Sequence, residues 1–139
     1  MKNKIFIYIE KQFKKMIKYS LEFPIKSSVK ILFNAISTPT GLSEWFANDV
    51  NWNGNTYTFI WDDGEQEAEL IKKINNFLVR FKWVDTDDDS YFELKIDIDS
   101  ITNDVILIIT DFADDDDEKE HEINLWNTQV QALMKSIGS

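Results

Sequence analysis

The chain has no cysteine and a single histidine, His121, among its 139 residues. The absence of cysteine excludes structural disulfides and thiolate metal sites. One histidine excludes most zinc sites and most catalytic triads. No apolar run approaches the roughly 18 to 20 residues that span a bilayer. No internal repeat or flexible linker appears, so the length predicts one domain with a sizeable core.

Charge is unevenly distributed along the chain. Residues 1–18 hold six lysines and one glutamate, whereas the whole chain has a formal net charge of −10. The acidic remainder would repel phosphate backbones, so we expect no nucleic-acid partner. The N-terminal "MKNKIFIYIEKQF" has an apolar run shorter than the ~7–15 residues of a signal peptide and no small-residue cleavage site. We therefore predict a cytoplasmic protein, with a basic extension over 1–15 and a domain over 16–139 that could start at Met16.

Acidic runs invite a calcium hypothesis, which the spacing does not support. Asp85, Asp87 and Asp89 match positions 1, 3 and 5 of a calcium loop, but Ser90 and Ile96 stand where glycine and glutamate are needed. The run over 114–118 departs from the motif at the same two positions. Solvated charge is the simpler interpretation, and we expect no metal site.

No signature of catalysis emerges from the remaining polar residues. The chain has no Gly-rich phosphate loop, nucleophile elbow or paired-carboxylate motif. His121 lies among acids at the start of a helical pattern and is interpreted as a surface residue. Glu44 could anchor a polar ligand head, but an exposed helical glutamate is the simpler interpretation. We expect a non-enzymatic protein with no cofactor.

The first part of the domain predicts a strand and two short helices. Residues 17–24 alternate apolar and polar side chains and end at Pro24, as in a strand with one wet face. "SSVKILFNAIS" has a helical apolar stripe, with Ser27 or Ser28 as its cap. A second helix is predicted over 39–47, capped by Thr38 and started by a proline. Its apolar face consists of Leu42, Trp45 and Phe46. We expect this face to pack against another apolar surface of the protein.

Strands follow from residue 49 onward, separated by short turn signals such as "NGN" at 53–55. We predict them over 49–52, 56–61, 65–74, 77–84, 91–98 and 105–112. Such short connections favour an antiparallel meander. The strand 105–112 is apolar on both faces, which predicts a central or doubly covered position.

Alternation also predicts which side chains of the later strands face inward. The inward set is Ala68, Leu70, Ile74, Phe77, Val79, Phe81, Trp83, Phe92, Leu94, Ile96 and Ile98. Glu93, Lys95 and Asp97 are predicted to face water. Arg80 is predicted to point away from the aromatic face and to pair with an outer carboxylate.

The C-terminal stretch "EKEHEINLWNTQVQALMKSIGS" changes to a helical period. Ile123, Trp126, Val130 and Ile137 form its apolar face, together with either Leu133 or Met134. Gly138 is predicted to end this helix. A rod of about 18 residues at ~1.5 Å each is roughly 27 Å long, enough to cross a sheet.

This order of elements resembles the helix-grip fold of the START-like superfamily. The resemblance covers about residues 16–139 and rests on "LEFPIKSSVKILFNAIS", "STPTGLSEWFANDV", "ITDFADDDDEKE" and "LWNTQVQALMKSIGS". These motifs are especially similar to single-domain START-like proteins of Bacteroidetes, and the fold is shared with bacterial relatives of the heat-shock chaperone ATPase activator. The resemblance implies an α+β fold: a curved antiparallel sheet of six to seven strands, two short helices after the first strand, and a long C-terminal helix packed across the sheet.

The resemblance also implies a function, because members of this superfamily carry lipids, hormones or polyketides, or assist chaperones. In such folds a cavity lies between the sheet and the long helix. We therefore expect a small hydrophobic ligand to contact Trp45, Phe46, Tyr57, Phe59, Trp61, Phe81, Trp83, Phe92, Trp126 and Val130. The alternative is that these large side chains fill the core. The chain would then be a protein-interaction or chaperone-regulator-like module with a protein partner.

Overall fold

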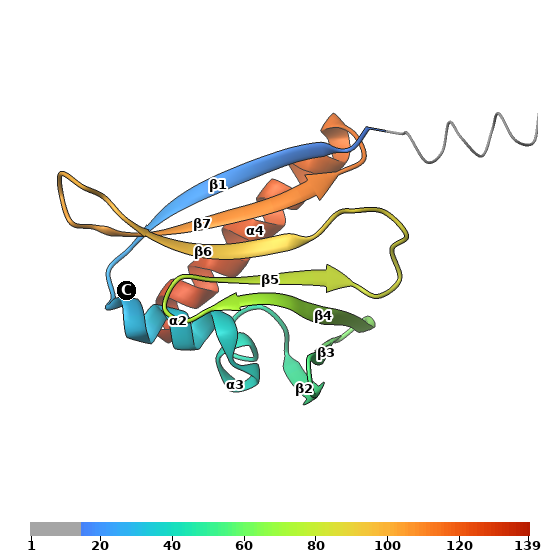
Figure 1. Ribbon diagram of the computed structural model, residues 1–139, viewed down its shortest axis with the longest axis horizontal. Coiled ribbons are helices and arrows are strands. Elements are labelled where there is room, and N and C mark those ends of the chain that lie inside the picture. Colours follow the sequence, from blue (N-terminus) through green and yellow to red (C-terminus); the bar gives the residue numbers. More distant parts are fainter. Residues whose placement is uncertain (1–14) are drawn as a thin grey trace, which may run out of the picture.

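A computed structural model describes residues 15–139 as a curved seven-stranded sheet with helices against one face (Figure 1). The strands are β1 (Ile17–Ile25), β2 (Asp49–Asn53), β3 (Thr56–Trp61), β4 (Gly64–Ile74), β5 (Leu78–Trp83), β6 (Phe92–Ile98) and β7 (Val105–Ala113). The helices are α2 (Val29–Ser37), α3 (Pro39–Leu42) and α4 (Asp116–Ser136). The predicted basic extension lies, apart from Lys15, outside the described residues.

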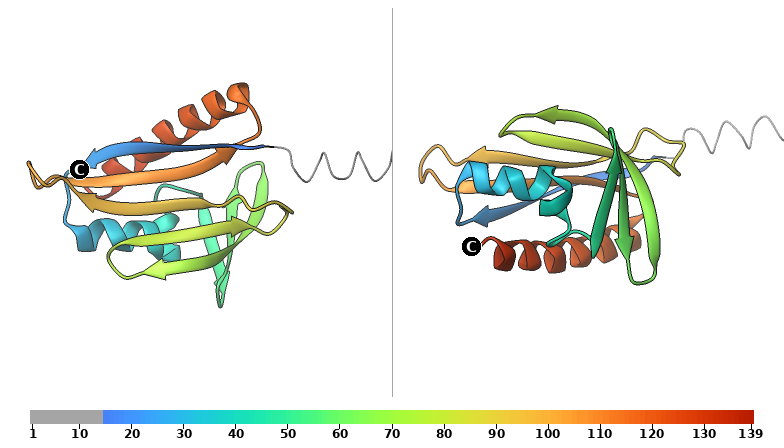
Figure 2. Two further views of the ribbon diagram at one scale, coloured as in Figure 1. Left: turned by 45° about the horizontal axis from the view of Figure 1, so that its top comes forward. Right: turned by 90° about the horizontal axis from the view of Figure 1, so that it is seen from below.

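All neighbouring strands run antiparallel, in the order β1-β7-β6-β5-β4-β3-β2. The predicted meander is therefore confirmed, and β1 closes it by pairing with β7, with Ile17 opposite Ala113. Figure 2 shows α4 lying along the same side of the sheet as α2 and α3, while β2–β4 curl round the helices. The predicted α+β helix-grip architecture is confirmed.

Strand β7 lies second from the edge of the sheet, between β1 and β6, and is not covered on both faces. Leu107 and Ile109 are fully buried beneath the helices, while Ile106 and Ile108 on the opposite face keep partial exposure. The helices all lie on the inner face, so the outer apolar side chains of β7 are shielded only by their neighbours on the sheet. The predicted central or doubly covered position is therefore wrong, although β7 is an interior strand with a neighbour on each side.

The two short helices start at the predicted caps. The Ser28 hydroxyl accepts from the amide of Ile31 at 3.1 Å, and the Thr38 hydroxyl accepts from the amide of Gly41 at 2.9 Å. Each bond satisfies a donor that the first helical turn leaves free. The open choice between Ser27 and Ser28 is thus resolved in favour of Ser28.

The helix predicted over 39–47 is too long, because α3 ends at Leu42. The carbonyl of Leu42 accepts from the amides of Trp45, Phe46 and Ala47 at 3.4, 2.9 and 3.3 Å. Because three amides donate to the same carbonyl, residues 43–46 form tight turns and do not continue the helix. The three apolar side chains predicted to share a face, Leu42, Trp45 and Phe46, are all buried nonetheless.

Gly41 allows α3 to approach α2 closely. A Cβ atom at this position would lie 2.3 Å from the Asn34 carbonyl oxygen and 2.7 Å from the Ala35 Cα atom. Both are backbone atoms, which cannot move aside without displacing α2. Glycine, which has no Cβ atom, is therefore required at position 41 for α2 and α3 to pack this closely.

Three residues predicted to face inward are substantially exposed: Ile74 at 42%, Phe77 at 41% and Ile98 at 50%. The register of β4 shifts between Leu70 and Lys72, and such a bulge changes which side chains face the core. Phe77 lies in the β4–β5 turn, where Asn76 has φ of 60°. Ile98 is the last residue of β6.

Glu93 was predicted to face water but is only 7% exposed. It points away from the core, as alternation requires, yet Arg80 covers it with bonds of 3.0 and 2.8 Å to Oε1. The Arg80 guanidinium in turn lies 4.2 Å from the ring centre of Tyr91. The predicted pairing of Arg80 with an outer carboxylate is confirmed.

The long helix packs with its predicted stripe on the sheet. Trp126, Val130 and Leu133 are buried, and Ile123, Met134 and Ile137 pack partly buried beside them. Leu133 is thus the more deeply buried of the two alternatives at that turn. Asp115 caps the start of α4, and Gly138, with φ of 72°, follows its end.

Candidate functional site

The ten residues predicted to contact a ligand come together in one cluster, here called the aromatic cluster. Alternation along β3, β5 and β6 directs the sheet members inward, the segment after α3 supplies two rings, and α4 supplies the opposing side. Eight of the ten are buried, and Trp61 and Trp83 keep partial exposure. Within this cluster the partly exposed edge is therefore formed by two tryptophans, whose centroids lie 6.5 Å apart.

Phe46 lies at the centre of the aromatic cluster. Its ring centroid is within 4.8–5.8 Å of five other rings, which belong to Trp45, Phe59, Trp61, Phe92 and Trp126. Phe92 extends the contacts outward to Phe81 at 5.2 Å and Trp83 at 5.0 Å. Such distances are those of packed aromatic pairs. The rings therefore contact one another, and a ligand would have to part them to lie between them.

The polar atoms of these rings are tied to the surrounding backbone. Trp45 Nε1 donates to the Ala35 carbonyl at 2.9 Å, and the Tyr57 hydroxyl donates to the Ser37 carbonyl at 3.3 Å. The carbonyl of Phe46 accepts from Trp61 Nε1 at 2.9 Å and from Gln129 Nε2 at 3.1 Å. No buried side-chain nitrogen or oxygen between residues 15 and 139 lacks a partner. These bonds orient the rings.

A carboxylate pair lies beside the aromatic cluster, between α4 and the β1–β7 edge. Trp126 Nε1 donates to Asp111 Oδ2 at 3.0 Å, and the Tyr19 hydroxyl donates to Glu122 Oε1 at 2.5 Å. Burial raises the pKa of Asp111 from 3.8 to about 6. Burial, with the nearby charges of Asp111 and Glu118, raises the pKa of Glu122 from 4.5 to about 7.

Burial and the bond to Glu122 also raise the pKa of Tyr19. Sequence analysis did not identify this pair. The available signal was Asp111 itself, which interrupts the apolar run 105–112 at a position that alternation directs inward beside Ala113.

A separate hollow of about 930 Å³ borders α2 and has no member of the aromatic cluster in its lining, and we call it the α2 groove. It is open to solvent and is bounded by four parts of the fold: α2, the α3 segment, the β4–β5 turn and the end of α4. Its lining is Lys30, Ile31, Phe33, Asn34, Ala35, Ser37, Thr38, Thr40, Gly41, Glu44, Lys73, Asn75, Asn76, Ser136 and Ile137. No sequence pattern predicts this groove, because its walls come from segments far apart in the chain.

The other polar candidates lie apart from the aromatic cluster. His121 and Glu44 are both exposed, and Glu44 lines the α2 groove. In the part of the chain that the structure describes, no group of three histidines or acids could hold a metal ion. Over the same residues, none of the helices has the length and apolar character needed to cross a bilayer.

Comparison with known proteins agrees with this architecture. A family model for the START-like superfamily domain matches residues 13–139. The fold and the match together define a START-like protein, and the chain belongs to that superfamily. A solution structure of a Bacteroides fragilis protein is 36% identical, has a TM-score of 0.63, and is matched over 88% of this chain and 91% of that one. No curated protein matches the chain significantly.

More distant solved structures share the fold alone. The Aha1 dimer of Colwellia psychrerythraea is 19% identical, with a TM-score of 0.73 over 88% of this chain and 96% of that one. DynU16, described as a protein of the dynemicin biosynthetic locus, is 13% identical, with a TM-score of 0.74. The match covers 88% of this chain but about half, 47%, of DynU16.

Proposed function

We propose that the protein is a cytoplasmic, non-enzymatic START-like domain that binds a small hydrophobic molecule between its sheet and α4. The aromatic cluster is the binding surface, and the segment 39–47 moves aside to admit the ligand. The observation that carries this proposal is the position of Phe46, whose ring contacts five others but whose backbone belongs to a short segment.

The segment 39–47 is the part of the cluster best suited to move. Its helix is a single turn, and its side of the cluster is tied by the bond of Trp45 to Ala35 and by the two bonds to the Phe46 carbonyl. Outward movement would withdraw Trp45 and Phe46 together. It would uncover an apolar patch of sheet and α4 rings, including Phe59, Phe92 and Trp126.

The energetics of opening define the ligand. Exposing two large buried side chains costs roughly 1.5–3 kcal/mol for each. A ligand must offset that cost with apolar contact of comparable area, so it is hydrophobic and at least the size of two rings. The same contacts support the proposed non-enzymatic role, since the polar atoms of these rings are already engaged by backbone or carboxylate partners.

Titration with an environment-sensitive fatty-acid probe, with aromatic competitors, tests this function. We expect saturable binding, and we expect Trp45→Ala to weaken binding more than it lowers the melting temperature. Trp52→Ala is the matched control, because Trp52 is 63% exposed on β2 and lies outside the cluster. No saturable binding across lipids and aromatics, or equal loss of binding and folding in Trp45→Ala, would exclude the proposed pocket.

A second candidate, a protein-interaction module with a filled core, is favoured by the direct contacts among the rings. In that case the acidic surface would engage a basic protein. Salt-sensitive capture of one specific protein, by wild type and by Trp45→Ala alike, would support it. Capture that a hydrophobic probe displaces would instead support the ligand-binding function.

A further inference from the structure

We propose that the α2 groove is a second binding site, specific for a small anionic amphiphile that has one carboxylate or phosphate group and a short apolar chain. The site is distinct from the aromatic cluster and does not depend on the function proposed for it. Its size, the two lysines of its lining and its apolar strip each support this assignment.

Size and construction are those of a ligand site. The volume of about 930 Å³ falls within the roughly 300–1,000 Å³ of small-molecule pockets. In Figures 1 and 2 the β4–β5 turn lies beside α2, so the groove has walls from both. Gly41 keeps the α3 end of the groove close to α2, since a Cβ there would meet the Asn34 carbonyl. Residues of both helices, Asn34 and Ala35 from α2 and Gly41 from α3, therefore line this end together.

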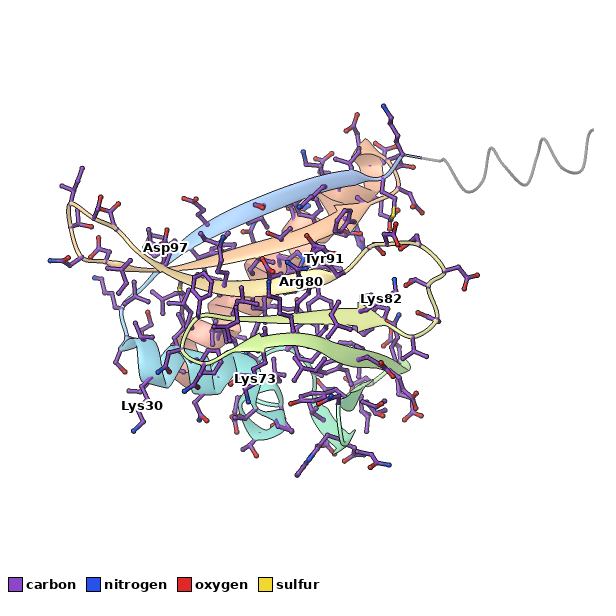
Figure 3. The ribbon with its side chains drawn as sticks, viewed as in Figure 1. Lys30, Lys73, Arg80, Lys82, Tyr91 and Asp97 are labelled. Atoms are coloured by element: carbon purple, nitrogen blue, oxygen red, sulfur yellow. The ribbon has the colours of Figure 1, made fainter. Side chains whose placement is uncertain are left out.

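Lysines on two separate walls provide the anion contacts. Lys30 comes from α2 and Lys73 from the end of β4, and Figure 3 shows both at the α2–α3 edge of the molecule. Neither forms an ion pair with any residue of the described range 15–139. The other lysines of residues 15–139 form no ion pair either, so what distinguishes Lys30 and Lys73 is that they line one hollow. A carboxylate or phosphate that reached either ammonium group would form a charge-assisted hydrogen bond.

Amides beside these lysines supply neutral donors for the same group. Asn34 lies one turn of α2 after Lys30, and Asn75 and Asn76 form the turn directly after β4. The left-handed φ of 60° at Asn76 fixes the shape of that turn. Amide donors and lysine ammonium groups together match an acceptor-only anion.

The apolar strip explains why the ligand carries a short chain. Ile31 lines the groove and is 52% exposed, and partly buried Ile137 lines the end formed by α4. A ligand chain of a few carbons could cover the Ile31 side chain. Removing this apolar surface from water would favour binding. Glu44 is the one acid of the lining and would disfavour a second anionic group at the α3 end.

An NMR titration of the ¹⁵N-labelled protein tests the site with sodium octanoate and octyl phosphate, with uncharged 1-octanol as the matched control. We expect saturable shifts at the amides of Asn34, Gly41, Asn75 and Asn76 with at least one anion. Octanol should bind about tenfold more weakly, since it lacks the charge-assisted bonds. The anion that binds more tightly identifies the head group.

Variants separate this site from general charge effects. The pair Lys30→Gln/Lys73→Gln should raise the dissociation constant of the anion about tenfold. The pair Lys15→Gln/Lys95→Gln makes the same change in net charge outside the groove and should leave it unchanged. Equal effects of the two pairs, equal binding of octanol, or shifts centred on Phe46 and Trp126 would overturn the proposal. The first pair should also leave the binding of an uncharged hydrophobic probe in the aromatic cluster intact, so the two proposals can fail separately.

Discussion

The ring of Phe46 lies 5.4 Å from the ring of Phe92, with the two planes 24° apart. This contact joins the segment after α3 to the central part of the sheet, across more than forty residues of sequence. The relationship makes Phe46 a stabilising residue. Under the proposed function, it is also a residue that must be displaced for a ligand to bind.

Phe46→Leu should lower the free energy of unfolding by about 2 kcal/mol, because leucine keeps an apolar side chain but loses the packed ring contacts. Urea denaturation measures the change. The matched control is Trp52→Leu on exposed β2, which should change stability by less than about 0.5 kcal/mol. Similar losses in both variants would show that the centre of the cluster is not tightly packed.

Gly41→Ala should destabilise the protein by about 2 kcal/mol, since the new Cβ would meet the Asn34 carbonyl at 2.3 Å. Thermal melting measures the effect. Thr40→Ala is the control, because Thr40 is exposed on the same turn and should be nearly neutral. An unchanged melting temperature in Gly41→Ala would contradict the close packing of α3 against α2.

The ion pair of Arg80 and Glu93 should contribute measurably, unlike most exposed pairs. Glu93 is nearly buried, so Glu93→Gln removes the negative charge that pairs with Arg80. The guanidinium of Arg80 then stays against the Tyr91 ring without its carboxylate partner. We expect a loss of about 1–2 kcal/mol in urea denaturation. Glu69→Gln, on exposed β4, is the control. A double-mutant cycle with Arg80→Met would give no coupling if the contact were incidental.

Stability should increase on mild acidification. The folded-state pKa of Glu122 is raised to about 7 and that of Asp111 to about 6, so the folded state binds protons that the unfolded state releases. Lowering the pH through these values, from about 8 to about 5.5, therefore raises the free energy of unfolding, before other acids protonate below their ordinary pKa values.

Glu122→Gln tests the source of that pH dependence. Glutamine keeps an acceptor for the Tyr19 hydroxyl but cannot ionise, so the increase in melting temperature between about pH 8 and about pH 5.5 should shrink. Glu120→Gln removes an exposed charge two residues away and should leave the increase unchanged. Equal pH profiles for wild type and Glu122→Gln would contradict the assignment.

The periodicity of apolar residues predicted helices and strands well where each element buries only one of its faces. Alternation placed Phe59 and Phe81 inward, and the cap at Ser28 and the stripe around Val130 were correct. Predictions failed where a nonlocal contact decides the outcome. Glu93 is buried because Arg80 reaches it from the adjacent strand, and Ile74 is exposed because a bulge shifts the register of β4.

The candidate sites divide in the same way. The aromatic cluster could be predicted, because each member follows from period and residue type within its own segment. The α2 groove could not, since Lys30 and Lys73 are brought to one hollow only by the packing of α2 beside the β4–β5 turn. The pair of Asp111 and Glu122 likewise depends on how α4 crosses β7.

The central claim is that the rings of the sheet and of α4 separate around a bound ligand. Aromatic and methyl NMR spectra recorded during titration with a fatty acid test it most directly. Our account predicts saturable shifts that appear together at Phe46, Phe92, Trp126 and Val130, with a single dissociation constant. Saturation with shifts confined to surface residues, or unchanged spectra for these four residues, would contradict it.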